Sequence, residues 1–218
     1  MKSKNINGPR GIYARRKNKH SKPDIGKISG PNQLWSWDIT HIRTTTRYCH
    51  FYLYVLLDWY SRKVIAWHLS DSLASDEAMT LWDKGLVAEN LSIEQYPKSL
   101  SDRGTQMRSI ATKVFFNNLG MKQLFSRPRT PNDNPQIESL FSTVKHVPKY
   151  PERFETISQA EKYFEEFFTW YNYEHYHTSI GMVTPNDRHT GNDMKIFNKR
   201  DEIKTQTFKQ RRLHHCKI

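Results

Sequence analysis

The stretch LWSWDIT, residues 34–40, alternates large apolar side chains with small or polar ones. Because successive side chains of a strand lie on opposite faces, this period of two predicts a β-strand. Residues 47–59 are dense in Tyr, Phe, Val and Leu, which is typical of a central strand that is buried on much of both faces. A third strand is predicted at residues 64–69. The short connections between these three strands favour antiparallel neighbours.

The hydrophobic period changes to that of a helix after the third strand. Ser75 is predicted as its N-cap, because two acidic residues follow it and suit the first turn. Residues 98–101 and 121–125 are predicted as short strands. Between them, residues 109–119 are predicted as a helix that ends at Gly120, the type of residue that closes a helix in the left-handed conformation.

Two more helices are predicted in the second half of the chain. Asn134 and Pro135 are typical of an N-cap and a first helical residue. Ser158 with Glu161 three residues later forms a capping-box pattern, which predicts the start of the last helix. Three antiparallel strands followed by alternating strands and helices predict an α/β fold, with a mixed five-stranded sheet flanked by helices.

The net charge of +12 over 218 residues comes from the two ends of the chain. Residues 1–34 contain nine Lys or Arg and one acid, and residues 195–218 contain eight Lys or Arg and two acids. Residues 35–194 contain 17 basic and 19 acidic residues, a net charge of −2. The positive excess therefore flanks a slightly acidic middle.

This distribution predicts three parts. Residues 1–30 are expected to form a basic flexible arm, residues 31–190 a catalytic core, and residues 191–218 a poorly ordered basic tail. A basic arm favours a polyanionic partner, because each phosphate contact releases condensed counterions. The alternative is a solubilising tail that binds nothing.

Several classes of protein are excluded. No run of about 18 apolar residues is present, so a membrane span is not expected, and the N-terminus lacks the apolar stretch of a signal peptide. Cys49 and Cys216 form no CxxC motif, which excludes a disulfide scaffold and a structural zinc site. The composition predicts a cytoplasmic protein.

Three carboxylates stand out by position. Asp38 lies in the middle of the first predicted strand, where an acid is costly unless it binds something. Asp102 follows the fourth strand, next to a glycine that allows close approach of the backbone, and Glu138 lies one turn into the helix that Pro135 begins. Three such carboxylates at one sheet edge suit Mg²⁺ or Mn²⁺.

Each carboxylate also has an ordinary interpretation. Asp38 could be a buried acid satisfied by backbone or by an arginine, Asp102 a turn residue, and Glu138 a solvent-facing helix acid. The apolar stripe of this last helix, Ile137, Leu140, Phe141 and Val144, places Glu138 on its flank. Lys145 lies two turns later on the same flank, about 10 Å away at 1.5 Å per residue.

Three segments together resemble a known family. They are WDIT at 37–40, SDRGTQ at 101–106 and DNPQIESLFSTVK at 133–145, with a further match around 170–185. The sequence resembles the catalytic core of bacterial insertion-sequence transposases, which is similar to the retroviral integrase domain of the DDE superfamily. The resemblance spans about residues 31–190. The 35 residues between Asp102 and Glu138 match the spacing of the family's signature.

The resemblance implies a ribonuclease-H-like fold and a DDE-type polynucleotidyl transferase. Asp38, Asp102 and Glu138 would hold two Mg²⁺ or Mn²⁺ ions for in-line attack on a phosphodiester. The reaction would be DNA strand cleavage and strand transfer during transposition. The implied partners are element ends and target DNA, bound by a homo-oligomer in a bacterial nucleoid.

The candidate DNA-binding residues are basic side chains near the carboxylates or in the first arm. They are Lys145, Arg103, Arg127, Arg129, Arg15, Arg16 and Lys17. The alternative for the arginines is an exposed charge that contacts nothing. Among the other candidates, the tryptophans are predicted as core residues, and His41 as structural. His175 and His177 are interpreted as helical residues that share no face and ligate no metal.

Two other functions remain open. Members of this family usually carry an N-terminal helix-turn-helix region, and no part of this sequence resembles one. The chain is therefore expected to be a partial copy. Such a copy could be a catalytically inactive DNA-binding remnant that acts as a competitor or regulator. A metal-dependent nuclease on the same fold, without strand transfer, is the third hypothesis.

Overall fold

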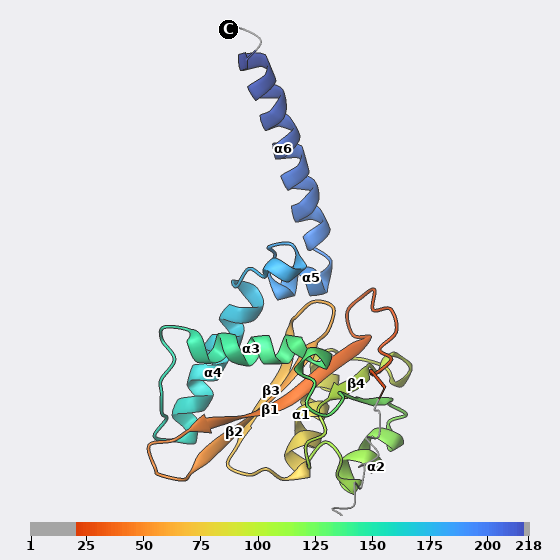
Figure 1. Ribbon diagram of the computed structural model, residues 1–218, viewed down its shortest axis with the longest axis vertical. Coiled ribbons are helices and arrows are strands. Elements are labelled where there is room, and N and C mark those ends of the chain that lie inside the picture. Colours follow the sequence, from red (N-terminus) through yellow and green to blue (C-terminus); the bar gives the residue numbers. More distant parts are fainter. Residues whose placement is uncertain (1–20, 216–218) are drawn as a thin grey trace, which may run out of the picture.

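A mixed five-stranded sheet forms the centre of the computed structural model, which describes residues 21–215 (Figure 1). The strands are β1 (Leu34–Arg43), β2 (His50–Asp58), β3 (Val64–Ser70), β4 (Lys98–Ser101) and β5 (Gln123–Phe125). Their order in the sheet is β3-β2-β1-β4-β5. The predicted mixed sheet and all five predicted strands are confirmed, with boundaries that move by up to three residues.

Strand β1 pairs antiparallel with β2 and parallel with β4. In the parallel pair, Ser36 lies beside Leu100. Asp38 comes two residues after Ser36, and Asp102 comes two residues after Leu100. Because the two strands run in the same direction, Asp38 in the middle of β1 lies level with Asp102, which comes just after the carboxyl end of β4.

Four of the six α-helices within residues 21–215 cover the two faces of the sheet, and the last one projects away from it (Figure 1). The helices are α1 (Ser75–Ala88), α2 (Ile110–Asn118), α3 (Pro135–His146), α4 (Ile157–Tyr173), α5 (Pro185–Thr190) and α6 (Asp193–His215), with short 3-10 turns η1 (Ile93–Gln95), η2 (Pro131–Asp133) and η3 (Thr178–Ile180). The side chains of α1 and α2 pack on one face, and those of α3 and α4 pack on the other. The sheet is therefore the middle layer of three (Figure 1).

Aromatic side chains fill the core between the sheet and α1 with α2. Trp35, Trp37 and Trp82 are fully buried, and Phe116 packs edge-on against Trp82 with ring centroids 4.9 Å apart. The indole nitrogen of Trp37 donates a hydrogen bond to Oγ of Ser99 over 3.0 Å, which satisfies its polar group. The prediction that these tryptophans belong to the core is confirmed, and burial of rings of this size is a main source of stability.

The core on the opposite face comes from two apolar helix stripes. The four predicted residues of α3, from Ile137 to Val144, are all buried. Helix α4 contributes Phe164, Phe167, Phe168 and Tyr171, as its sequence period predicts. The α3 stripe fixes which side of that helix faces the sheet, and therefore where Glu138 and Lys145 lie.

Two predicted helix starts are wrong by one or two residues. Helix α1 begins at Ser75 itself, and its N-cap is Ala74, which makes no side-chain cap. Helix α4 begins at Ile157, because the hydroxyl of Thr156 accepts a hydrogen bond from the backbone N–H of Gln159 and caps it. Thr156 can cap a helix as Ser158 can, and it lies two residues earlier in the chain.

The predicted poorly ordered tail is also wrong for most of its length, because Asp193–His215 forms the 23-residue helix α6. This stretch contains no Gly or Pro and many Lys, Arg and Gln residues, all good helix formers. It lacks the apolar period by which a helix is recognised in a sequence. Helix α6 projects away from the sheet (Figure 1).

The first arm is only partly described. Ile25 and Ile28 pack against the small cluster formed around Leu34 and Leu100, and Nζ of Lys98 donates to the carbonyl oxygen of Ile25 over 3.2 Å. These contacts place residues 25–28 on the core rather than in a free arm. Arg15, Arg16 and Lys17 lie outside the described residues. Within residues 21–215, no helix is both long and apolar enough to cross a membrane.

Candidate active site

Asp38 lies on the sheet face that α3 covers. Its neighbours Trp37 and Ile39 point to the α1 face, so the period of two sends Asp38 and Thr40 to the other face. One carboxylate oxygen accepts the backbone N–H of Ile39 over 2.8 Å. The pKa of Asp38 is raised to about 7, mainly by burial and to a smaller extent by the nearby Asp102 and Glu138 carboxylates. The charge of this carboxylate is therefore poorly compensated in the protein.

Asp102 directly follows β4 and shapes the turn after it. Its Oδ1 accepts the backbone N–H of Gly104 over 2.8 Å, the turn arrangement that its sequence context allows. A Cβ atom at position 104 would lie 3.0 Å from that oxygen and 2.8 Å from Sδ of Met107. Glycine is therefore the residue that lets this backbone approach the Asp102 carboxylate.

Helix α3 brings an acid and a cation to the same face. Glu138 is exposed in its first turn, on the flank of the buried stripe. Lys145 lies two turns later, and its Nζ donates to Oγ1 of Thr40 over 2.9 Å. Because Thr40 is two residues beyond Asp38 on the same strand face, this bond fastens α3 beside Asp38. The sequence period could have identified Thr40 as a neighbour of the site.

The four charged groups act on one another electrostatically. Asp102 and Glu138 raise the pKa of Asp38, and Lys145 lowers it. Among the described residues, no three His, Cys, Asp or Glu side chains are placed to hold a metal ion as they stand. The donor set nevertheless fits a hard divalent cation, because it offers carboxylate oxygens with an uncompensated negative charge. The carboxylates would have to move closer to share one ion.

The nearby arginines have partners within the protein. The guanidinium of Arg127 donates to both oxygens of the buried Asp133, each over 2.9 Å. Nε of Arg103 donates to the carbonyl oxygen of Ser126 over 3.0 Å, and its guanidinium lies over the ring of Phe125. Both arginines therefore hold the loops around the site.

The histidine interpretation needs a correction. Helix α4 ends at Tyr173, so His175 and His177 are not helical, and their ring centroids lie 5.0 Å apart. Nε2 of His177 is 2.8 Å from the hydroxyl of Tyr171. Burial lowers the pKa of His177 to about 4, so its ring is neutral and serves packing. His41 lies on the opposite sheet face, against Tyr52.

A buried polar network, which we call the Asp58 network, was not foreseen from the sequence. Oδ1 of the fully buried Asp58 accepts both the N–H and the hydroxyl of Ser61 over 2.7 Å. Nδ1 of His189, on α5, lies 3.0 Å from that hydroxyl, and Nε2 lies 2.8 Å from Oε2 of Glu89. Lys63 pairs with Glu89 over 2.8 Å. The members come from separate segments, so no local motif marks them.

The sheet order and the flanking helices together define an α/β fold of the ribonuclease-H-like class. Two models of the integrase core domain match the chain, one over residues 29–131 and the other over residues 119–185. Both matches are to the integrase core domain, and together they span residues 29–185 of this chain. The resemblance expected from the three motifs is therefore confirmed.

Curated relatives are transposases of bacterial insertion sequences. The chain is 29% identical over 168 residues to the transposase of insertion sequence element IS904 from Lactococcus lactis. This alignment covers 75% of this chain and 63% of that protein. It is 30% identical over 125 residues to transposase InsF of IS3A from Escherichia coli, which covers 54% of this chain and 39% of that protein. The chain thus spans less than two thirds of the length of these relatives.

Solved structures share the fold. The catalytic core domain of HTLV-2 integrase in complex with magnesium matches with a TM-score of 0.53 at 14% identity, over 73% of this chain and 97% of that one. The catalytic domain of Mos1 mariner transposase matches with a TM-score of 0.53 at 17% identity, over 63% of this chain and 70% of that one. A chain of a simian T-cell lymphotropic virus intasome matches with a TM-score of 0.56 at 20% identity, over 81% and 62%.

Proposed function

We propose that the chain is the catalytic part of a DDE-type DNA transposase that cleaves and transfers DNA strands. Asp38, Asp102 and Glu138 are its catalytic residues, and residues 31–190 are its core. One observation carries the proposal: Asp38 is half-buried with a poorly compensated charge and lies near two more carboxylates, in a chain that matches the integrase core domain.

The carboxylates would hold Mg²⁺ or Mn²⁺, as two ions. Such ions, when bound, lower the pKa of an attacking water or DNA 3′-hydroxyl and neutralise charge on the phosphate. The chain's own residues prepare this site. Gly104 and the Ile39 N–H orient the two aspartates, and Thr40 holds the ammonium group of Lys145 beside them. That ammonium group is placed to contact a DNA phosphate.

The proposed partners are element ends and target DNA, bound by a homo-oligomer in a bacterial cytoplasm. The bacterial transposase relatives support DNA as the substrate and the bacterial cytoplasm as the compartment. A structural neighbour that belongs to an intasome and another that is dimeric support an oligomer. Arg103 and Arg127, which hold loops around the site, and Arg129 are proposed DNA-binding residues.

A branched duplex that mimics the product of strand transfer tests the chemistry without recognition of element ends. With Mn²⁺ or Mg²⁺, the full chain should resolve the branch, which reverses the joining step. D38N, D102N and E138Q should reduce the rate at least 100-fold while DNA affinity changes less than about twofold. D76N, which removes an exposed acid of α1, is the matched control and should keep the rate.

Each alternative has its own result in this assay. If the wild-type chain binds the duplex but D38N changes nothing and no product forms, the chain is a DNA-binding competitor or regulator. If the chain nicks DNA with divalent ions but neither joins strands nor resolves the branch, it is a nuclease. Either result would overturn the transposase proposal.

A further inference from the structure

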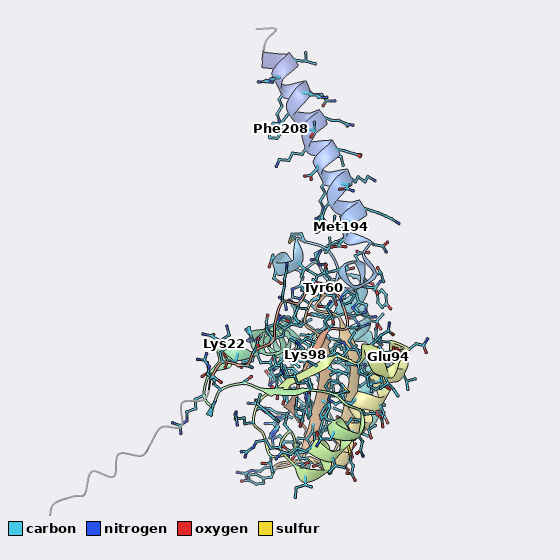
Figure 2. The ribbon with its side chains drawn as sticks, turned by 90° about the vertical axis from the view of Figure 1, so that its right-hand side faces the viewer. Lys22, Tyr60, Glu94, Lys98, Met194 and Phe208 are labelled. Atoms are coloured by element: carbon cyan, nitrogen blue, oxygen red, sulfur yellow. The ribbon has the colours of Figure 1, made fainter. Side chains whose placement is uncertain are left out.

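Helix α6 carries a large positive charge away from the sheet. Its basic residues are Lys195, Lys199, Arg200, Lys204, Lys209, Arg211 and Arg212, and its acids are Asp193, Asp201 and Glu202. Asp193 is buried and paired with Arg188, so two acids remain exposed against seven basic residues. Figures 1 and 2 show the helix extending beyond the rest of the protein.

The base of α6 is fixed to the core. The guanidinium of Arg200 donates to the carbonyl oxygens of Gly181 and Met182, each over 2.7 Å. Gly181 leaves room for the ring of Phe197, because a Cβ atom there would lie 2.8 Å from that ring. Arg188 binds Asp193 at the first turn. These contacts set the direction in which α6 leaves the core.

The outer half of α6 presents basic side chains to solvent. Within residues 21–215, no hydrogen bond or ion pair occupies the side chains of Lys204, Lys209, Arg211 or Arg212. At 100° per residue, Lys204 and Arg211 continue the side of the helix on which Arg200 lies, while Lys209 and Arg212 point elsewhere. Positive charge therefore surrounds the outer half rather than forming one narrow seam.

The apolar residues of α6 do not form a face. Met194, Ile203, Phe208 and Leu213 are all more than half exposed. Relative to Met194, the other three lie about 180°, 320° and 100° around the helix axis. Figure 2 shows Met194 at the base of this projecting helix and Phe208 in its outer half. Without an apolar seam, pairing with a second copy would bring like charges together and bury little surface.

A nucleic-acid backbone satisfies these properties. Its regularly spaced phosphates complement a cationic rod, and binding requires no apolar contact. A helix with its side chains is about 10–12 Å wide, which matches a major groove of about 12 Å. The 23 residues of α6 span about 34 Å, which is about one turn of a B-form duplex.

We propose that α6 is a DNA-binding arm that lies along the duplex and neutralises phosphates through Lys204, Lys209, Arg211 and Arg212. The arm binds independently of base sequence and holds DNA outside the catalytic core. This inference rests on the proposed function, since the duplex held by α6 would be the substrate of the core.

The test measures affinity of the full chain for a labelled duplex of random sequence, without divalent ions, over a range of salt. The variant K204Q/K209Q/R211Q/R212Q keeps helix formers and removes four charges. The control K113Q/K122Q/K149Q/K162Q removes four exposed charges from the core, so both variants have the same net charge. Circular dichroism and sedimentation of each variant check helix content and assembly.

The α6 variant should bind at least 10-fold more weakly at about 0.1 M salt, and its plot of log affinity against log salt should flatten by about 3 to 4. The control should change affinity less than about threefold. Equal losses in both variants, or an unchanged slope, would overturn the proposal. A changed sedimentation coefficient with unchanged DNA affinity would overturn it in favour of self-association.

The outcome for α6 is distinct from that for the catalytic core. The binding assay contains no divalent ions, so it measures duplex affinity without any strand chemistry at the carboxylates. An α6 variant with unchanged binding, next to an active wild type in the branched-duplex assay, would overturn the DNA-binding arm alone. A wild-type chain that binds no duplex would overturn both proposals.

Discussion

At the scale of single residues, the candidate site depends on where backbone and carboxylate meet. Gly104 is the clearest case, because the space around it is filled by Asp102 and Met107 rather than by solvent. Its backbone N–H orients Asp102, and its missing side chain is what allows that bond. A substitution of Gly104 should therefore change the orientation of Asp102 more than it changes the stability of the fold.

We predict that Gly104→Ala reduces the rate of metal-dependent strand chemistry at least 10-fold. The new methyl group would displace the Asp102 carboxylate, whose Oδ1 lies 3.0 Å from the added Cβ position. Both close contacts are ends of flexible side chains, so the free energy of unfolding should change by no more than about 1 kcal/mol. Branch resolution with Mn²⁺ and urea unfolding measure the two effects.

Gly120→Ala is the matched control, because it has the opposite properties. Gly120 has a φ of +66° and no atom within 4 Å of its added Cβ position. Alanine there should cost about 1 kcal/mol of stability through left-handed backbone strain, while the reaction rate stays unchanged. If Gly104→Ala retains the full rate, Asp102 is not oriented as we propose.

At the scale of elements, the sequence predicts well those features that depend on a short stretch of neighbouring residues. The period of two identifies β1, and the stripe from Ile137 to Val144 identifies the buried side of α3. Asp38 stands out because an acid interrupts an otherwise apolar strand. These features depend on neighbours in the chain, so they need no knowledge of the tertiary structure.

The missed features depend on distant segments or on propensity alone. His189 meets Glu89 across 100 residues of sequence, and no local pattern links them. Helix α6 is stabilised by good helix formers and has no apolar face, so its sequence shows no hydrophobic period that would predict a helix. The gathering of Asp38, Asp102 and Glu138 was expected from element order, whereas the bond from Lys145 to Thr40 required the packing of α3 to be known.

The Asp58 network attaches α5 to the sheet, and we predict that it makes stability depend on pH. Burial alone would lower the pKa of His189, but its interactions with Asp58 and Glu89 outweigh that effect and raise it above the ordinary 6.5. Burial would raise the pKa of Glu89, but hydrogen bonds from His189, Lys63 and Asn32 lower it to about 2. Both groups are thus stabilised in their charged forms.

The direction of the pH effect follows from these shifts. The contribution of His189 is fully present below pH 6.5 and is lost as the pH rises through its raised pKa. The contribution of Glu89 is present above pH 4.5 and is lost as the pH falls toward about 2. The network should therefore stabilise the protein most between pH 4.5 and pH 6.5.

His189→Gln tests this window. At pH 6 the variant should lose about 2–4 kcal/mol in the free energy of unfolding, because it breaks a buried charged pair. The difference from wild type should shrink as the pH rises above the His189 pKa. His68→Gln, which breaks a more exposed pair with Glu77, is the control and should cost at most about 1 kcal/mol. Urea unfolding from pH 5 to pH 9 measures both; a pH-independent loss for His189→Gln would contradict the linkage.

At the scale of the whole molecule, the excess of positive charge lies in other parts of the chain than the three carboxylates. The acidic stretch from 35 to 194 contains the three carboxylates, which need a local negative field to attract divalent cations. The excess of basic residues lies before and after it, in the first arm and in α6. DNA affinity and catalysis should therefore respond to different substitutions.

The last prediction is that the two basic ends contribute independently to DNA binding. Replacing Arg15, Arg16 and Lys17 with glutamine removes three charges, which should flatten the salt dependence of duplex affinity by about 2 to 3. When these three substitutions are combined with the four in α6, the slope should change by about 6, because the effects of independent contacts add. Fluorescence anisotropy with a labelled duplex at several salt concentrations measures each variant. A combined slope no larger than that of the α6 variant would show that the first arm makes no phosphate contact, and that α6 alone accounts for the binding that the charge of +12 predicts.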